Sequence, residues 1–181
     1  YIELFDHRFL SLINESKFNC LGALIVKHRS SENRISGACS DVDRDFISKR
    51  SMVLKNISIE AYKKQMWLPS FIDDVSVHPK HVADVMTDID SYFNAHDYQY
   101  YIYGHPGIGS LHVRVVLSIH SHKQMITIGR DIFNIVNHYG GTLVGEHNMG
   151  RNRSHYLFLE KPELFEMMKH IKKCAFQKPF R

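Results

Sequence analysis

The sequence predicts an α+β domain of the ferredoxin-like class, in which helices pack on one face of an antiparallel sheet. The first observation is the order of the patterns over residues 71–145, which is β-α-β-β-α-β. The second is a glycine-rich stretch, residues 104–110, that separates the two central strands and indicates a tight turn. The third is the length of 181 residues, which suits one core but not two domains side by side. We therefore expect a single domain over residues 1–181, with its core over residues 71–176.

Hydrophobic periodicity defines the first half of this unit. Residues 71–77 form a β-prone run, and Pro79 is compatible with a helix start because its missing N–H has no partner in the first turn. Residues 98–103 and 111–119 are predicted as the strands of the hairpin. The helix that follows Pro79 is identified by an apolar stripe at helical spacing: Val82, Val85, Met86, Ile89 and Phe93.

The second half of the unit repeats the pattern. Apolar side chains recur at helical spacing over residues 125–139, and Gly140 and Gly141 can end this helix in the left-handed conformation. A short strand is expected over residues 142–145. A last helix, residues 162–173, is expected to bury one apolar side.

The first 70 residues carry a weaker pattern. Residues 6–16 have helical spacing, and residues 22–28 form a short apolar run that suits a strand. Most of residues 29–58 is rich in Ser and Asn, with a helix expected only over residues 46–57. A helix and a strand are therefore expected to open the chain.

The second hairpin strand is predicted to have two chemically different faces. Successive side chains of a strand point to opposite faces, so Leu111, Val113 and Val115 are expected in the core. His112 and Arg114 then lie on the other face, which is expected to be mostly polar. One strand would thus supply both the core and a functional surface.

Charge and cysteine content exclude several classes of function. The chain has 23 Lys and Arg against 19 Asp and Glu, without long basic runs, so no nucleic-acid partner is expected. Cys20, Cys39 and Cys174 lack CxxC spacing, which argues against a disulfide framework or a thiolate metal site. The longest apolar stretch is far shorter than the roughly 18 residues of a membrane span. The expected location is the cytoplasm, with peripheral attachment to the inner face of a membrane as an alternative.

Four residues indicate a metal site. His105 ends one hairpin strand and His112 lies on the polar face of the next, so the turn can bring their imidazoles together. Glu146 and His147 follow the last predicted strand, whose end lies near the hairpin in a split βαβ sheet. Two His and one carboxylate would leave open positions on a metal, as in catalytic sites. Adjacent Glu146 and His147 are expected to point in different directions, so that one binds the metal and the other acts as a base.

Each of these residues also has a structural interpretation when taken alone. A histidine at a strand end is usually a polar rim residue, and a Glu-His pair between glycines can be an exposed loop. Arg114 and Arg151 could be surface charges. Arg114 shares a face with His112, however, and an arginine beside a metal suits bidentate binding of a carboxylate.

Two motifs resemble the C-terminal domain of FAD-linked oxidases. The first is Tyr-Gly-His-Pro-Gly-Ile-Gly-Ser-Leu-His over residues 103–112. The second is Gly-Gly-Thr-Leu-Val-Gly-Glu-His-Asn-Met-Gly-Arg over residues 140–151. The family includes D-lactate dehydrogenase, the glycolate oxidase flavoprotein subunit and D-2-hydroxyglutarate dehydrogenase, within the vanillyl-alcohol oxidase superfamily. The resemblance covers residues 71–176 and, more loosely, residues 3–57.

The resemblance implies the substrate or cap domain of an FAD-dependent dehydrogenase or oxidase. Such an enzyme oxidises a D-2-hydroxy acid of the lactate, glycolate or 2-hydroxyglutarate class to the 2-oxo acid by hydride transfer to flavin. The flavin would be held mainly by an N-terminal FAD-binding domain, which is expected to be absent from this chain. The fragment alone is therefore expected to be inactive. The partners that the resemblance implies beyond the flavin are an electron-transfer flavoprotein, an iron–sulfur protein or a quinone.

The resemblance also assigns roles by motif match. His105, His112 and Glu146 fall where metal-dependent members hold a divalent ion, which is expected to be zinc. His147 falls where the family has a general base, and Arg114 and Arg151 would bind the substrate beside it. Residues on the cofactor side of the two motifs are Gly107, Gly109, Ser110 and Asn148.

The sequence departs from the family pattern at two acidic positions. Ile108 and Met149 stand where the family commonly has Asp. Outer carboxylates orient ligating histidines, so their loss is expected to loosen or abolish metal binding. The alternative function is a degenerate, non-catalytic cap domain that acts as a binding or assembly module. A free-standing ferredoxin-like domain fits the topology but leaves both motifs unexplained.

Overall fold

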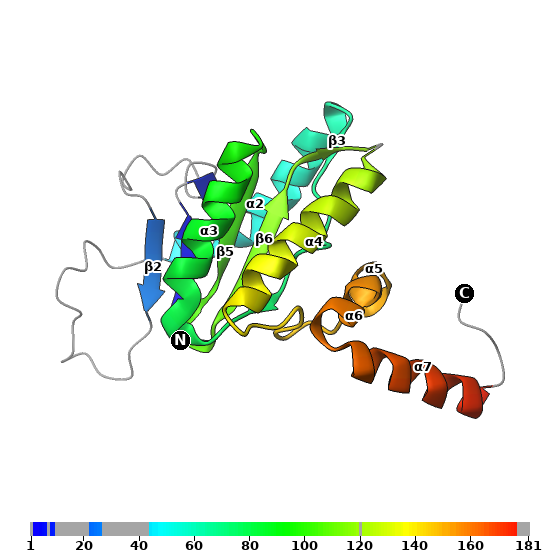
Figure 1. Ribbon diagram of the computed structural model, residues 1–181. Coiled ribbons are helices and arrows are strands. Elements are labelled where there is room, and N and C mark those ends of the chain that lie inside the picture. The colour runs from blue at the N-terminus through cyan, green and yellow to red at the C-terminus, as the bar shows by residue number, and fades with distance from the viewer. Residues whose placement is uncertain (1, 7, 10–21, 27–43, 120, 177–181) are drawn as a thin grey trace.

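The computed structural model describes residues 2–6, 8–9, 22–26, 44–119 and 121–176 (Figure 1). Five strands in these ranges form one antiparallel sheet in the order β2-β1-β5-β6-β4. A separate pair joins β3 (Met66–Trp67) to β7 (Leu117–Ser118). The strands of the large sheet are β1 (Ile2–Asp6), β2 (Gly22–Val26), β4 (Val75–Ser76), β5 (Tyr100–His105) and β6 (Ser110–Val115).

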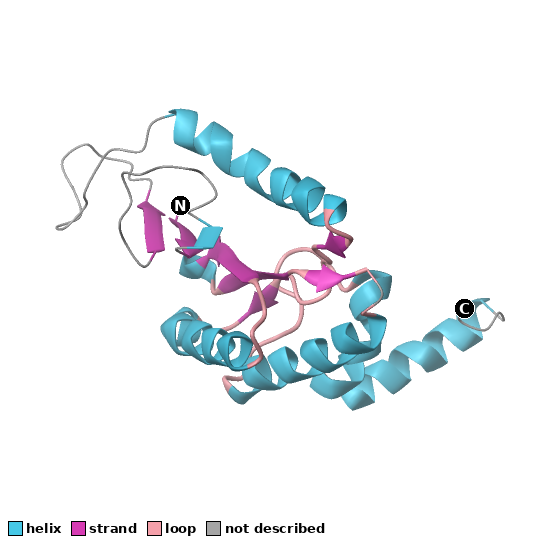
Figure 2. Cartoon of the chain, turned by 90° about the horizontal axis from the view of Figure 1, so that it is seen from above, coloured by secondary structure: helices cyan, strands magenta, loops and turns pink. Residues whose placement is uncertain are grey.

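Helices lie on both faces of the large sheet (Figure 2). On one face are α3 (Val82–Ala95), which follows the short turn η1 (Pro79–His81), and α4 (His122–His138). On the other face is α2 (Arg44–Lys63). The turn η2 (Pro106–Ile108) joins β5 to β6. After α4 the chain forms α5 (Gly150–Arg153), η3 (Ser154–Tyr156), α6 (Leu157–Glu160) and α7 (Pro162–Phe176).

The main core lies between the sheet and helices α3 and α4. Leu111, Val113 and Val115 of β6 point into it and are fully buried, which confirms the predicted alternation. The apolar stripe of α3 is also confirmed, because Ile89 and Phe93 are fully buried in the same cluster. The α+β class, with helices packed on an antiparallel sheet, is therefore established.

A second, smaller apolar cluster lies under α2, on the opposite face. Val53 and Ile57 of α2 pack there with Tyr101 of β5 and Val116, which follows β6. The expectation that helices cover only one face is therefore wrong. Tyr101 and Val116 make part of the second face apolar, and α2 removes that part from water.

The opening segment differs from its prediction. The chain opens with the strand β1, which was not predicted and which pairs with both β2 and β5. This strand overlaps the expected helix over residues 6–16 only at Asp6. Asp6 ends this strand: its carboxylate accepts the Phe9 N–H at 2.7 Å and the Ile102 N–H at 3.0 Å. Residues 8 and 9 are helical, and residues 10–16 lie outside the described residues. The expected strand at 22–28 is confirmed as β2, and the helix at 46–57 as the longer α2.

Three other predicted elements are shorter or less buried than expected. The strand at 71–77 is reduced to β4, and the strand at 142–145 to one bridge between Ser76 and Thr142. Strand β6 ends at Val115, after which the chain turns into β7. The last helix is present as α7, but its apolar side chains are 41–59% exposed because it extends away from the body (Figure 1). These side chains are Leu164, Met167, Met168 and Ile171.

No helix in the described part of the chain combines the length and the apolar character that a membrane crossing requires.

Candidate functional site

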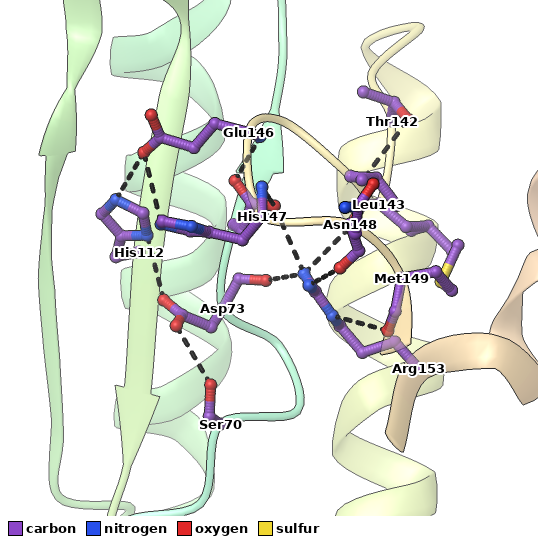
Figure 3. A network of polar contacts seen from close by, with 12 residues as sticks. Ser70, Asp73, His112, Thr142, Leu143, Glu146, His147, Asn148, Met149 and Arg153 are labelled. Atoms are coloured by element: carbon purple, nitrogen blue, oxygen red, sulfur yellow. Dashed lines mark hydrogen bonds and ion pairs between the residues drawn. The ribbon is translucent and has the colours of Figure 1, made fainter. Parts of the chain in front are cut away.

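Figure 3 shows that His112, Glu146 and His147 meet where the β5–β6 hairpin approaches the loop after the Thr142 bridge. His105 is the last residue of β5, and His112 lies on β6, on the face opposite the main core. Glu146 and His147 come from the loop that precedes α5. Two segments that are more than 30 residues apart in the sequence therefore supply the site.

The side chains converge on one oxygen atom, Oε1 of Glu146. This atom lies 3.1 Å from Nε2 of His112, 3.6 Å from Nε2 of His105 and 3.5 Å from Nε2 of His147. The rings of His105 and His112 are 5.6 Å apart, so the predicted meeting of the two imidazoles across the turn is confirmed.

The prediction that Glu146 and His147 point in different directions is wrong. Both side chains turn toward His112, because the backbone of the loop wraps around the carboxylate of Asp74. The N–H of Glu146 donates to Oδ1 of Asp74 at 2.7 Å, and the N–H of His147 donates to Oδ2 at 2.8 Å. Two successive N–H groups directed at one carboxylate leave both side chains on the same side of the loop.

His112 is held from behind by a buried carboxylate. Its Nδ1 lies 3.0 Å from Oδ1 of Asp73, and the two side chains are only 6% and 12% exposed. The other oxygen of Asp73 accepts from Arg114 Nη2 at 2.6 Å and from Ser70 Oγ at 3.0 Å. Burial alone would raise the pKa of Asp73, but the hydrogen bond from His112 and the charge of Arg114 together lower it. Asp73 is therefore an ionised acceptor.

This pairing determines which nitrogen of His112 faces the site. An ionised carboxylate can only accept, so Nδ1 of His112 donates to Asp73. In the neutral imidazole the lone pair then lies on Nε2, which faces another acceptor, Oε1 of Glu146, at 3.1 Å. A cation bound by Nε2 of His112 and Oε1 of Glu146 would give both lone pairs a partner.

The spacing of the donor atoms fits a divalent ion. Ligand atoms bound at roughly 2.0–2.2 Å to a tetrahedral ion are about 3.3–3.6 Å apart. The three distances from Glu146 Oε1 to imidazole nitrogens, 3.1, 3.5 and 3.6 Å, are close to this range. The nitrogen and carboxylate donors are those that zinc accepts, and the hydrogen bond from His112 to Asp73 is typical of an outer carboxylate behind a metal-bound histidine.

Asp74 is also close enough to be considered as a ligand. One donor atom from each of Asp74, His112, Glu146 and His147 lies within 4.8 Å of the others. Both oxygens of Asp74 already accept loop N–H groups, however, and its side chain is fully buried. His105 is not part of this group, although its Nε2 lies 3.6 Å from Oε1 of Glu146. The metal-binding role of His105, His112 and Glu146 stays a prediction.

Comparison with known proteins identifies the family. Residues 40–175 match the family described as FAD linked oxidases, C-terminal domain. The chain belongs to this family. This is the family that the two motifs indicated.

Several curated relatives are similar to part of this FAD-linked oxidase domain. It is 35% identical over 108 residues to a D-2-hydroxyglutarate dehydrogenase of Haemophilus influenzae, covering 56% of this chain and 10% of the relative. It is 31% identical over 105 residues to an Escherichia coli protein of the same name, again covering 56% and 10%. The identity to glycolate oxidase subunit GlcD of Bacillus subtilis is 27% over 107 residues, covering 57% and 23%. The chain therefore spans only about a tenth of the first two relatives.

The two arginines assigned to substrate have different positions. Arg114 donates from Nη2 to Asp73, and its buried Nε has no hydrogen-bond partner among the described residues. Arg151 lies in α5, and its side chain is outside the described part of the structure. The substrate-binding role of both residues stays a prediction.

The four residues assigned to the cofactor do not form one surface. Gly107 and Asn148 are exposed, whereas Gly109 and Ser110 are buried. Gly109 has a structural role: its φ is +76°, and a Cβ there would lie 1.7 Å from the carbonyl oxygen of Val77. Ser110 is 1% exposed, and its Oγ has no partner in the described residues. Gly109 and Ser110 do not fit direct contact with a flavin, and the role of Gly107 and Asn148 stays a prediction.

His112 has an outer carboxylate even though Ile108 and Met149 stand at the two usual Asp positions. Ile108 is 64% exposed in the hairpin turn, and Met149 packs partly against the main core. The carboxylate behind His112 is that of Asp73.

The sequence analysis assigned no role to Asp73, Asp74 or Arg153. Arg153 is buried and donates to the backbone oxygens of Asp73, Leu143 and Asn148. A signal was present, because two consecutive acids interrupt the apolar run at 71–77. Buried carboxylates need partners, so an acidic pair in such a run indicates a polar network.

Proposed function

We propose that this FAD-linked oxidase domain is the substrate-side cap of an enzyme that oxidises a D-2-hydroxy acid to the 2-oxo acid. The observation that carries the proposal is the convergence of three imidazole nitrogens on one carboxylate oxygen. The matched relatives are named for D-2-hydroxyglutarate and glycolate, which are both 2-hydroxy acids. The whole of residues 1–181 would act as one domain, with a ferredoxin-like unit formed by β4, α3, β5, β6, α4 and the Thr142 bridge.

The metal ligands in this proposal are His105, His112 and Glu146. Bound there, a divalent ion such as zinc would supply a Lewis acid that makes the substrate hydroxyl more acidic. His112 contributes Nε2 because Asp73 holds the proton on Nδ1. Glu146 contributes Oε1, which already faces all three imidazoles.

His147 is the base in this proposal. Its side chain is 58% exposed, and its Nε2 lies 3.5 Å from Glu146 Oε1, so it can reach a substrate beside the ligands. A neutral imidazole accepts a hydroxyl proton near neutral pH, because its ordinary pKa is close to the working pH. Arg114 and Arg151 are the candidates for binding the substrate carboxylate.

The flavin belongs to another part of the proposed enzyme. FAD would supply the hydride acceptor and would be bound by a separate FAD-binding domain. The electron acceptor after the flavin would be an electron-transfer flavoprotein, an iron–sulfur protein or a quinone, in a cytoplasmic or peripheral location.

The proposal is tested by zinc titration of the purified protein with a chromophoric competing chelator. We expect stoichiometric zinc in the wild type and none in the His105→Ala/His112→Ala double variant. The matched control is His122→Ala/His138→Ala, which removes two exposed histidines of α4 and is expected to bind zinc normally.

Calorimetry on the zinc-loaded protein then tests the substrate class. We expect zinc-dependent binding of D-lactate, glycolate or D-2-hydroxyglutarate, which is lost in the double histidine variant. A wild-type protein that takes up no zinc at high micromolar concentrations would contradict the proposal. It would favour the degenerate module, for which the exposed apolar Ile108 at a usual Asp position is the supporting observation.

A further inference from the structure

We infer that the Asp73–Asp74 dipeptide is the positioning element of this site. The inference rests on the proposed metal site and extends it to two residues that do not face the metal. Asp73 would fix the proton of His112, and Asp74 would fix the loop that carries Glu146 and His147. The two segments that supply the ligands would thus be held in register by one pair of adjacent residues.

Asp73 acts on the hairpin half of the site. Its Oδ1 holds Nδ1 of His112 at 3.0 Å, while Arg114 and Ser70 fix the other oxygen at 2.6 Å and 3.0 Å. A carboxylate held by three partners cannot rotate away from the imidazole without breaking charge-assisted bonds. Nε2 of His112 is therefore kept directed toward Glu146, whose Oε1 lies 3.1 Å away.

Asp74 acts on the loop half. Its side chain is fully buried, and its two oxygens each accept one N–H of the loop, from Glu146 and from His147. Its backbone oxygen also accepts the N–H of Gly145 at 2.8 Å. A Cβ on Gly145 would lie 2.8 Å from Oδ1 of Asp74, so glycine is needed for the loop to close on this carboxylate.

The backbone at Asp74 is arranged for this double role. Its φ of +73° lies in the left-handed region, which non-glycine residues adopt only at an energetic cost. Arg153 holds the conformation, because its guanidinium donates to the backbone oxygens of Asp73 and Asn148 and lies 3.6 Å from Oδ2 of Asp74. A left-handed residue kept in place by a buried arginine indicates a functional constraint at this position.

The first experiment measures zinc affinity and the proton position of His112 in Asp73→Asn. Asparagine keeps the shape of aspartate, but its amide NH₂ must face either the donor of Arg114 or Nδ1 of His112, and the second arrangement favours the proton on Nε2 of His112. We expect zinc affinity to fall about 10–100-fold, as for other outer partners of metal-bound histidines. Long-range ¹H–¹⁵N correlation of the zinc-free protein at about pH 8 should show Nδ1–H for His112 in the wild type and a mixture of tautomers in the variant.

Controls separate positioning from general stability. Asp131→Asn changes a carboxylate that accepts from Tyr92 at 3.2 Å, far from the site, and should alter neither reading. If Asp73→Asn does not fold, Ser70→Ala removes one bond to the same carboxylate and should weaken zinc binding about twofold to fivefold. Unchanged zinc affinity and an unchanged tautomer in the variant that folds would overturn the role of Asp73.

The second experiment measures amide exchange of Glu146 and His147 in Asp74→Asn. Loss of the charged acceptor should speed exchange of both amides at least about tenfold and weaken zinc binding by a similar factor. Gly145→Ala should have the same effect without changing the carboxylate itself, because its Cβ displaces the loop. Wild-type exchange rates in both variants would overturn the role of Asp74.

The proposed function and this inference fail in different ways. A wild-type protein without zinc affinity would contradict the metal site alone. The tautomer of His112 and the exchange of the loop amides would still decide whether the dipeptide positions these residues.

Discussion

The two faces of strand β6 differ in what holds them together. On one face Leu111, Val113 and Val115 are fully buried in a large apolar core against α3 and α4. On the other face His112 and Arg114 are fixed by ion pairs and hydrogen bonds to Asp73. The first face depends on buried apolar area, which is non-directional, and the second on donors and acceptors at fixed distances. The alternation of a single strand thus separates the apolar core from the polar cluster around Asp73.

The largest expected effect is a loss of stability when the apolar core on the first face is truncated. Phe93 is fully buried in the main core, where its ring stacks on Tyr100 at 4.6 Å. We expect Phe93→Ala to lower the free energy of unfolding by about 3–5 kcal/mol, through lost burial and a residual cavity. Urea unfolding measures this loss, while the zinc affinity of the folded variant should match that of the wild type.

Ile57→Val in α2 is a smaller truncation on the other face, because it removes a single methylene group. Ile57 belongs to the smaller cluster. We therefore expect the free energy of unfolding to fall by an amount near the lower end of about 0.5–1.5 kcal/mol. If Phe93→Ala changed the zinc affinity of the folded protein, the two faces would be coupled and the comparison would not hold.

The second effect concerns Gly109, in the turn between β5 and β6. Gly109 has a φ of +76°, and its carbonyl accepts the N–H of Val77 at 3.0 Å. Gly109→Ala should lower the free energy of unfolding by more than about 2 kcal/mol, because the left-handed conformation is strained and the new Cβ overlaps the Val77 carbonyl. Thermal unfolding with calorimetry measures this loss.

Gly140→Ala is the control for backbone strain alone. Gly140 also has a positive φ, +66°, but a Cβ there would meet no atom within 4 Å. We expect Gly140→Ala to lower the free energy of unfolding by about 1 kcal/mol. Equal losses at the two positions would show that the close approach of Gly109 to Val77 contributes nothing.

The smallest effect is a pH dependence at the edge of the main core. Burial alone would raise the pKa of Asp90, but bonds from Tyr100, Arg8 and Asn94 bring it below its usual value of 3.8. A folded pKa below the unfolded one adds stability above that usual value, and the contribution is lost as pH falls through the folded pKa.

Asp90→Asn should therefore be less stable than the wild type at about pH 7, with a difference that shrinks as the pH falls below 3.8. The difference should be small, because Asp90 is partly exposed and solvent screens its interactions. Urea unfolding at neutral and at acid pH measures it. A difference that persists in acid would show that the carboxylate charge is not its cause.

Much of the fold and of the site could be predicted because the signals are local. The stripe of α3 and the alternation of β6 depend only on residues a few positions apart, so the sequence carries them directly. The tight turn between His105 and His112 constrains those two imidazoles in the same way. The motifs at 103–112 and 140–151 added the family, which comparison with known proteins bears out.

Tertiary structure alone decided the contacts that join distant segments. Asp73 reaches His112 across 39 residues, and Asp74 reaches Glu146 across 72. The direction of Glu146 and His147 depends on that carboxylate and not on their adjacency, which is why the expected divergence was wrong. Likewise, α2 covers the second face because Tyr101 of β5 and Val116, which follows β6, form an apolar patch only after the sheet has assembled. Periodicity determines how a segment folds, whereas long-range pairing determines what its side chains touch.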